Sequence, residues 1–337
     1  MSQLPLGRYA EIHQYVNLNG PGDSRPTALQ IVQDEGLVGQ LEDKVALVTG
    51  VSSGLGFETL KALAATGATV YGTARDLSKA RRTLGEDLAS SPNVRLIEMD
   101  LASLDSVRAA AEDIRRQTDK LNILVNNAGV LHIREGLKTD DGFEMQFGVN
   151  HLAHFLLFLE LKDVIAGSST PEFNSRVVTV TSSGHRLQGV NWGDVNFLRP
   201  GTYDGYKAYG QSKTANILMA NGVDHRFDGI HGYSVHPGTA MTGLQVEVKE
   251  HMEEFKKDKA AWKTAKSPAQ CAATIVLAAL SKDFEGEGPL YLEDCEAKGE
   301  TKENLGWAGE GYAPWAWDRA EEDRLWELSL ELVGLKQ

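Results

Sequence analysis

Residues 44–56 read Lys44-Val45-Ala46-Leu47-Val48-Thr49-Gly50-Val51-Ser52-Ser53-Gly54-Leu55-Gly56. The apolar run at their start has no helical period, which predicts a strand buried on both faces. Three glycines follow, and 57–66 is typical of a helix. Glycine permits a tight turn and a close approach of the backbone to a ligand, and the start of a helix offers unpaired N–H groups to an anion. We therefore predict a strand–loop–helix unit that holds a nucleotide pyrophosphate.

The same letters contain a second pattern. Residues 50–54 also fit G-x-S-x-G, the nucleophile elbow of serine hydrolases. That pattern explains neither Gly56 nor the motifs further along the chain, so we prefer the nucleotide interpretation. The residues predicted to contact the nucleotide in this loop are Gly50, Ser52, Ser53, Gly54, Leu55 and Gly56.

Composition limits the possible partners. The 337 residues are 42% hydrophobic and 24% charged, as in an ordinary globular protein, and the net charge of −13 argues against nucleic acid or an anionic membrane surface. Two cysteines suit a reducing compartment. The N-terminus lacks the pattern of a secretory signal, and the apolar run 152–159 is too short to span a bilayer. We expect a cytoplasmic protein without a membrane span.

Strand-like and helix-like segments alternate from Lys44 onward. The strand-like runs lie at 44–49, 68–73, 94–99, 121–125, 176–181, 230–235 and 289–292. Alternation predicts a parallel sheet covered on both faces, and right-handed crossovers favour the doubly wound arrangement. We predict a single α/β domain, a Rossmann fold with seven parallel strands, at 44–293. An arm at 1–43 precedes it, either packed on the domain, joined to a subunit contact or disordered, and an extension at 294–337 covers the substrate side.

Capping residues predict where several helices begin. Ser103 is placed to cap one helix, and Ser267-Pro268 combines a capping residue with a first-turn proline. A short helix is expected at 27–35. A longer helix is expected at 318–333, with leucines on one face.

The end of the second predicted strand bears on coenzyme choice. Arg75 lies 19 positions after Gly56, where a dinucleotide fold places the group that reads the adenosine ribose. A guanidinium suits the 2′-phosphate of NADP, whereas an acid there would bind the free hydroxyl of NAD. Asp76 follows directly and complicates the choice. We predict NADP, with NAD as the alternative.

Further motifs follow in a fixed order along the chain. They are Asp100-Leu101 after the third strand, Asn126-Asn127-Ala128-Gly129, Asn150 in Val149-Asn150-His151-Leu152, Ser183 at a strand end, the Y-x-x-x-K of Tyr209 and Lys213, and Pro237-Gly238-Thr239. With the T-G-x-x-x-G-x-G of residues 49–56, this set resembles the short-chain dehydrogenase/reductase family. Phrases such as Ser234-Val235-His236-Pro237-Gly238 resemble its retinol-dehydrogenase-like branch, and the two extensions are similar to fungal members. Such a resemblance implies a ketoreductase, here one of secondary metabolism.

The resemblance also implies site roles. Asn150, Ser183, Tyr209 and Lys213 would be catalytic, while Arg75, Asp100, Leu101, Asn127, Ala128, Gly129, Tyr209, Lys213, Pro237, Gly238 and Thr239 would complete the coenzyme site with the glycine loop. The chemistry agrees with these roles. A free phenol has a pKa of roughly 10, so it needs a lower pKa to act as an acid–base group at neutral pH. An ammonium one helical turn away, together with oxidised nicotinamide, would lower the Tyr209 pKa. Ser183 would position the carbonyl, and Asn150 would anchor a water linked to Lys213.

Several alternatives stay open from the sequence. Tyr203 and Lys207 form an overlapping Y-x-x-x-K, and Ser182 competes with Ser183 because neighbours on a strand face opposite sides. No metal site is expected, so His151 and His154 are assigned structural roles, and Cys295 a buried filler role. His185 and His236 flank the predicted site and are also assigned structural roles, with contact to the substrate as the alternative. Trp315 and Trp317 either close the substrate pocket or pack the tail, and Tyr206 is a candidate for the substrate mouth.

The combined prediction is an NADP(H)-dependent oxidoreductase acting on a carbonyl or alcohol of an apolar small molecule. Segments 184–205 and 240–266 and the tail would wall the pocket, with Phe197, Tyr203, Leu244, Phe255 and Trp262 supplying apolar surface. The alternatives are a coenzyme-bound epimerase, dehydratase or cyclase, or a non-catalytic coenzyme sensor. A homodimer or homotetramer is what the family resemblance implies.

Overall fold

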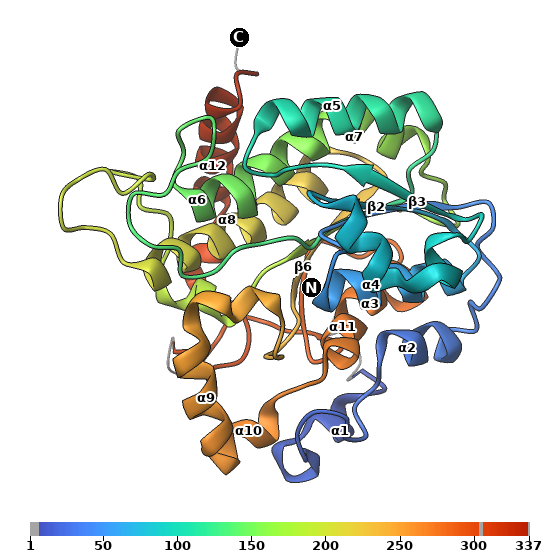
Figure 1. Cartoon of the computed structure of the whole chain (residues 1–337), viewed down its shortest axis with the longest axis horizontal. Helices are drawn as coiled ribbons and strands as arrows, with labels where there is room; N and C mark the ends of the chain where they lie inside the picture. Colours follow the sequence, from blue (N-terminus) through green and yellow to red (C-terminus); the bar gives the residue numbers. More distant parts are fainter. Residues whose placement is uncertain (1–6, 303–305, 336–337) are drawn as a thin grey trace.

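The computed structural model describes residues 7–302 and 306–335. One sheet runs through its centre in the order β3-β2-β1-β4-β5-β6-β7-β8 (Figure 1). The strands are β1 (Val45–Thr49), β2 (Thr69–Ala74), β3 (Val94–Glu98), β4 (Ile123–Asn126), β5 (Ser175–Val180), β6 (Ile230–His236), β7 (Leu290–Glu293) and β8 (Glu296–Ala297). The first seven are parallel, which confirms the doubly wound α/β prediction.

The eighth strand is a departure from the predicted seven. β8 pairs antiparallel with β7 through a two-residue turn, and both turn residues, Asp294 and Cys295, have positive φ. A turn of this kind matches the twist of a hairpin. The strand has only two residues, too few to leave an alternating pattern in the sequence.

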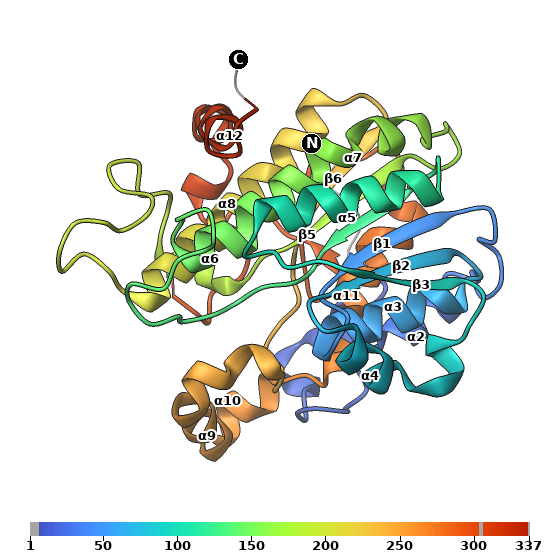
Figure 2. The ribbon, with the colours of Figure 1, turned by 45° about the horizontal axis from the view of Figure 1, so that its top comes forward.

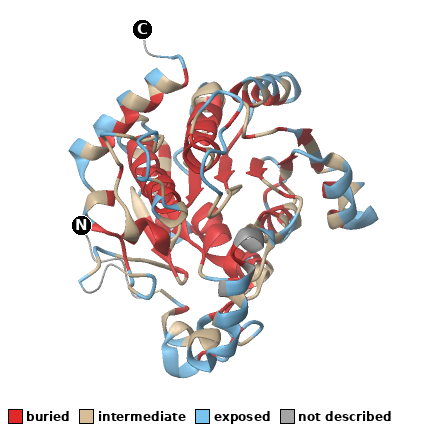
Figure 3. Cartoon of the chain, turned by 60° about the vertical axis from the view of Figure 1, so that its left-hand side comes forward, coloured by how far each residue is buried: buried red, intermediate tan, exposed pale blue. Residues whose placement is uncertain are grey.

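Helices cover both faces of the sheet (Figure 2). One face carries α2 (Ala28–Asp34), α3 (Gly54–Ala65), α4 (Leu77–Ala89) and α11 (Pro268–Leu280), and the other carries α5 (Leu104–Gln117), α7 (Ala153–Gly167), α8 (Gly205–Arg226) and α12 (Arg319–Leu332). Each face has its own apolar core, and burial is concentrated there rather than in the outer helices and loops (Figure 3). None of the helices among the described residues is long and apolar enough to cross a membrane.

Shorter elements complete the described chain. The short helices are α1 (Ala10–His13), α6 (Met145–Phe147), α9 (Lys249–Lys257) and α10 (Lys259–Thr264), and a π-helical turn spans Gly148–Leu152. Single 3-10 turns occupy Tyr15–Asn17, Ser183–Leu187, Gly243–Val248, Lys282–Phe284 and Pro314–Ala316.

The predicted helix starts are confirmed by their hydrogen bonds. The side chain of Ser103 accepts from the Ser106 N–H, and Thr27 caps α2 in the same way through Gln30. Ser267 and Gln270 form a reciprocal capping box at the start of α11. Such caps satisfy N–H groups that have no partner inside the helix.

The N-terminal arm packs on the domain from Gly7 onward. Helix α2 buries Ala28, Ile31 and Val32 in the core shared with α3 and α11. The arm also runs beside the outlying pair α9–α10, which we call the lid (243–264) (Figures 1 and 2). Arg25 is 3% exposed, pairs with Asp23, and donates to the carbonyls of Thr264 and Ala265. The arm therefore holds the C-terminal end of the lid.

Candidate active site

The predicted Tyr209 and Lys213 lie one turn apart on α8. This helix starts where the Asp204 carboxylate accepts hydrogen bonds from the N–H groups of Tyr206 and Lys207. Tyr209 and Lys213 are both buried, and Lys213 Nζ is 5.6 Å from the centroid of the Tyr209 ring. The overlapping pair is arranged differently, because Tyr203 precedes the helix and its hydroxyl donates to the Ile133 carbonyl. Only Tyr209 and Lys213 thus share the buried face of one helix.

Burial dominates the electrostatics of this pair. The apolar surroundings raise the Tyr209 pKa to about 12 and lower the Lys213 pKa to about 7, because each environment disfavours the charged form. Lys213 Nζ donates one hydrogen bond, of 3.0 Å, to the Val180 carbonyl. The sequence led us to expect a lowered Tyr209 pKa, whereas burial in the coenzyme-free protein raises it.

The two candidate serines, Ser182 and Ser183, occupy the turn that follows β5. A side-chain interaction with Ser182 lowers the Tyr209 pKa and so partly opposes the rise that burial causes. Ser183, the predicted residue, offers its backbone N–H to His236 Nδ1 at 3.2 Å. The chain turns into a 3-10 segment here, with Ser182 accepting from the Gly184 N–H. Ser183, predicted from the sequence, and its rival Ser182 thus both lie in the turn between β5 and α8.

Asn150 occupies the π-helical turn before α7. Its side-chain Oδ1 accepts a hydrogen bond from the Val130 N–H at 2.8 Å. Its Nδ2 donates to the Val130 carbonyl at 3.0 Å and to Ser212 Oγ at 2.9 Å. A Cβ built on Gly129 would lie 3.1 Å from Asn150 Oδ1 and 3.4 Å from Lys213 Nζ. Such π-helical turns are frequent at functional sites. Asn150 thus fastens the loop after β4 to the catalytic helix.

The four histidines near the site are buried and held neutral. Burial lowers the pKa of His151, His185 and His236 to about 3 and that of His154 to about 4. Each is hydrogen-bonded within the protein; His154, for example, links the Asn150 carbonyl at 3.0 Å to Thr49 Oγ1 at 2.9 Å. These contacts agree with the structural roles predicted for them.

The glycine loop after β1 leaves no space for side chains. A Cβ on Gly56 would lie 2.3 Å from the Gly50 carbonyl oxygen and 2.6 Å from Asn127 Nδ2. Gly50 and Gly54 have positive φ, which L residues rarely adopt. Within the described residues the Ser53 side chain does not cap α3, so the first N–H groups of that helix face outward. Ser52 and Leu55 are both partly buried in this segment, and the start of a helix is a favourable position for an anion.

The other predicted coenzyme residues gather at the carboxyl edge of the sheet. Thr49 Oγ1 accepts from the N–H groups of Asn127 and Ala128 at 2.9 and 3.0 Å, which ties the end of β4 to the glycine loop. The Asp100 carboxylate accepts from the Ala102 N–H, and Leu101 is buried. The strand order reverses between β1 and β4 at this edge, where α/β sheets bind ligands.

The Pro237-Gly238-Thr239 turn is braced by Lys266, which lies just after the lid. The Lys266 N–H donates to the Thr239 carbonyl at 2.8 Å, and the Lys266 ammonium pairs with Asp294 at 2.5 Å. A Cβ built on Gly54 would lie 3.3 Å from Thr242, the residue directly before the lid. The base of the lid therefore adjoins both the turn after β6 and the glycine loop.

Arg75 is exposed just after β2, at the carboxyl edge. Asp76, which complicated the choice of coenzyme, accepts a hydrogen bond from the Lys79 N–H and caps α4. Capping α4 is a structural role for the Asp76 carboxylate, and this role requires no contact with a coenzyme. Arg75 and Asp76 are both exposed, and the Asp76 carboxylate is the one of the two that caps a helix.

The sequence did not identify two features beside Tyr209. Arg186 is fully buried, pairs with Glu293 at 2.9 Å and donates through Nε to the Gly311 carbonyl at 2.8 Å. Glu293 in turn accepts from the Gly311 N–H, so the pair fastens the tail to the segment after β5. The second feature is Trp307, whose ring lies near Gly184 and Tyr206. No local pattern marks either, because the partners are far apart in the chain.

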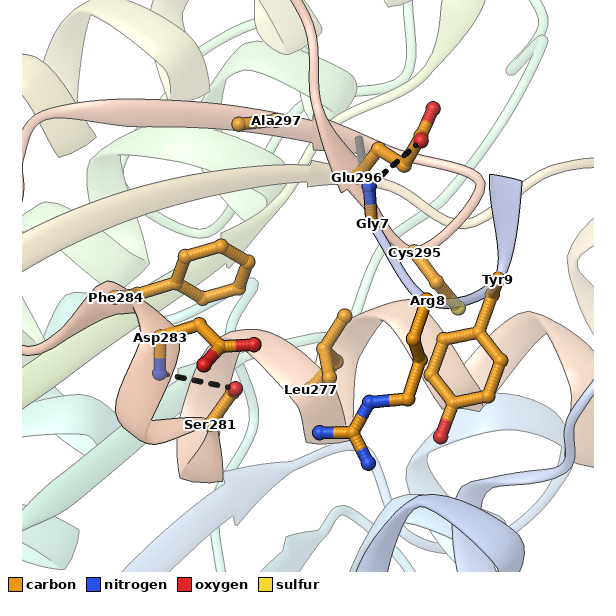
Figure 4. A pocket seen from close by; sticks show the side chains of 10 residues that line it. All are labelled: Gly7, Arg8, Tyr9, Leu277, Ser281, Asp283, Phe284, Cys295, Glu296 and Ala297. Carbon is orange, nitrogen blue, oxygen red and sulfur yellow. Dashed lines mark hydrogen bonds between the residues drawn. The ribbon is translucent and has the colours of Figure 1, made fainter. Parts of the chain in front are cut away.

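Other predicted pocket residues have different neighbours. Phe255 packs on Trp262 within the lid, and Trp262 lies against Gly20 of the arm. Trp317 stacks on Tyr312, and Trp315 Nε1 donates to the His185 carbonyl. A cavity of about 80 Å³ lies between the arm, the end of α11 and the β7–β8 turn, with buried Cys295 in its wall (Figure 4). None of the predicted site residues lines that cavity.

The sheet is doubly wound, and its glycine loop lies at the point where the strand order reverses. With the buried Tyr209–Lys213 pair, this arrangement is typical of dinucleotide-binding oxidoreductases. A sequence model of the short chain dehydrogenase family matches residues 44–195. The chain is 46% identical to the short-chain dehydrogenase/reductase prx1 of Penicillium roqueforti over 336 residues, covering 98% of this chain and 97% of the other. It is 33% identical to human retinol dehydrogenase 14, covering 88% of each.

A solved structure supports the same fold. An uncharacterised protein from Mycobacterium paratuberculosis is 28% identical, with a TM-score of 0.60, and the match covers 86% of this chain and 93% of the other. The chain belongs to the short-chain dehydrogenase/reductase family, whose members are NAD(P)-dependent oxidoreductases. Its relatives include retinol dehydrogenases, as the sequence phrases predicted.

Proposed function

We propose that this protein is an NADP(H)-dependent oxidoreductase that interconverts a carbonyl and an alcohol on an apolar small molecule. The supporting observation is the buried pair of Tyr209 and Lys213 at the edge of the sheet that carries the glycine loop. Relatives named retinol dehydrogenases support an apolar substrate. We further propose a cytoplasmic homodimer or homotetramer.

Each catalytic side chain has a distinct task in this proposal. Tyr209 donates its phenolic proton to the carbonyl oxygen as the carbon is reduced, and takes a proton back in the alcohol direction. The Ser182 hydroxyl holds the substrate oxygen against the phenol and steadies the phenolate that forms. Lys213 uses one of three ammonium donors on the Val180 carbonyl, which leaves two for ribose hydroxyls. Asn150 keeps the loop of Gly129 beside Lys213.

The nicotinamide supplies or accepts the hydride when the coenzyme is bound. The α3 N-terminus with Ser52, Ser53, Gly54 and Leu55 fits the pyrophosphate, because the close approach of Gly56 to the Gly50 carbonyl leaves no room for a side chain at Gly56. Asp100 and Leu101 would meet the adenine, while Asn127, Ala128, Gly129, Pro237, Gly238 and Thr239 would meet the nicotinamide half. Exposed Arg75 favours NADP, since its neighbour Asp76 is occupied as a helix cap.

The proposal is tested by following NADPH oxidation with a panel of ketones. Tyr209→Phe is expected to lower kcat by roughly 10²- to 10⁴-fold, since a positioned proton donor contributes that much, while NADPH still binds. Unchanged turnover in this variant would overturn the proposed role of Tyr209.

Coenzyme choice is tested in the same assay. Wild-type enzyme is expected to prefer NADPH over NADH, and Arg75→Glu to reverse the order because a carboxylate repels the 2′-phosphate. Arg81→Glu, a charge reversal at an exposed position of α4, is the matched control. If both variants change the preference for NADPH over NADH equally, the overall electrostatic field of the protein, rather than a specific contact of Arg75, sets that preference.

A further inference from the structure

Three aromatic side chains from distant segments meet beside the catalytic tyrosine. Tyr206 lies in the first turn of α8, His132 in the loop after β4, and Trp307 in the tail. The ring centroids of His132 and Tyr206 are 4.3 Å apart, and those of Tyr206 and Trp307 are 5.9 Å apart in an edge-to-face arrangement. We call these three residues the aromatic wall.

The aromatic wall adjoins Tyr209 across a glycine. A Cβ built on Gly184 would lie 3.0 Å from two ring carbons of Tyr209 and 3.4 Å from Trp307 Cη2. The missing side chain at Gly184 therefore lets the indole of Trp307 come close to the phenol. The Gly184 N–H also donates to Ser182 Oγ at 3.1 Å, which places the serine at the same turn. A molecule held by the phenol and the serine would lie within reach of the indole.

Trp307 differs from the other tryptophans of the tail. Trp317 stacks on Tyr312 with the ring planes 14° apart, and Trp315 is anchored to the His185 carbonyl and packs at Gly189. Trp307 is 49% exposed, although it is a large apolar group next to a buried catalytic residue. An indole face open to solvent at such a place gains free energy when a flat apolar surface covers it.

We propose that the aromatic wall selects planar, conjugated carbonyl compounds, such as aryl ketones, by stacking against Trp307 next to Tyr209. This inference rests on the proposed oxidoreductase function and names the substrate class for the same site. A flat π-system can lie on the indole while its conjugated carbonyl reaches the phenol in the same plane. A saturated ring of equal size makes fewer close contacts with a flat face, so the site should discriminate between the two.

The test compares acetophenone with cyclohexyl methyl ketone, which differ in the flatness of one ring. In NADP-saturated enzyme, Trp307→Leu is expected to weaken acetophenone binding by about two- to ten-fold, as one aromatic contact does, and cyclohexyl methyl ketone binding by less. Trp307→Phe should restore most of the preference. Trp317→Leu, the same change in the same tail at a residue that stacks elsewhere, should leave the ratio of the two dissociation constants unchanged.

The outcomes separate this inference from the proposed function. Equal loss for both ketones in Trp307→Leu, or a wild-type protein without preference for the flat ketone, overturns the aromatic wall. Absence of NADPH-dependent turnover in the wild type overturns the oxidoreductase proposal instead. Selective loss of acetophenone binding in Trp307→Leu would still support the aromatic wall in that case, because binding is measured without turnover.

Discussion

Replacing Lys213 with methionine should abolish catalysis and yet make the protein more stable without coenzyme. The ammonium is 3% exposed and makes one hydrogen bond, to the Val180 carbonyl. Burial lowers its pKa from 10.5 to about 7, so the folded state disfavours the charged form. Methionine has a similar length and carries no charge to bury. A residue retained for chemistry at a cost in stability is common at active sites.

The size of the effect follows from this shift. Each pKa unit corresponds to about 1.4 kcal/mol, so charging Lys213 in the folded state costs at most about 5 kcal/mol. Losing its hydrogen bond subtracts about 1 kcal/mol, and Asn216 Nδ2 continues to donate to the Val180 carbonyl. We expect a net gain of about 2 to 4 kcal/mol for Lys213→Met. With an unfolding entropy of about 2.1 cal/mol/K per residue, that gain raises Tm by roughly 3 to 6 °C.

The effect also has a defined pH dependence. Below pH 7 both states hold the Lys213 proton, so the full cost is present. Between the folded pKa of about 7 and the unfolded value of 10.5 the unfolded state binds the extra proton, so wild-type stability rises with pH. The advantage of Lys213→Met should therefore be greatest at pH 6 and shrink as the pH approaches 10.5.

Thermal unfolding of the coenzyme-free proteins at pH 6 and pH 10 measures this difference. Lys207→Met is the matched control, because Lys207 is an exposed residue of the same helix and its removal should change stability by no more than about 0.5 kcal/mol. The reasoning is refuted if Lys213→Met is less stable than the wild type at pH 6, or if its advantage is the same at both pH values.

Two further predictions concern the serine position and the arm. Ser182→Ala should lower kcat by roughly 10²-fold, the effect of losing one donor at a developing oxyanion, whereas Ser183→Ala should retain most of the activity; equal losses would contradict the assignment to Ser182. Arg25→Met should reduce the unfolding free energy by about 3 to 5 kcal/mol in urea, because it leaves buried Asp23 without its partner, and should speed proteolysis within the lid. Arg8→Met, at an exposed ion pair of the same arm, should cost far less, and a similar cost would argue against the buried pair as the anchor.

Local spacing allowed the sequence to predict much of the site. The glycine loop after β1 depends on φ values and close approaches that only glycine tolerates. The positions of the glycines within residues 50–56 therefore predict the conformation of the loop. Tyr209 and Lys213 are four residues apart, and the helical period places them on one face wherever the helix lies. Helix caps at Ser103 and Ser267 are likewise properties of a few neighbouring residues.

Residues that act through distant partners were decided by the tertiary structure alone. The turn that carries Ser182 and Ser183 is 3-10 rather than extended, which the strand-like pattern before it does not indicate. The ion pair of Arg186 and Glu293, the arm's hold on the lid through Arg25, and the position of Trp307 beside Gly184 all join segments more than a hundred residues apart. Sequence periodicity records which face of an element is apolar, but the partner that covers that face is selected only when the whole chain packs.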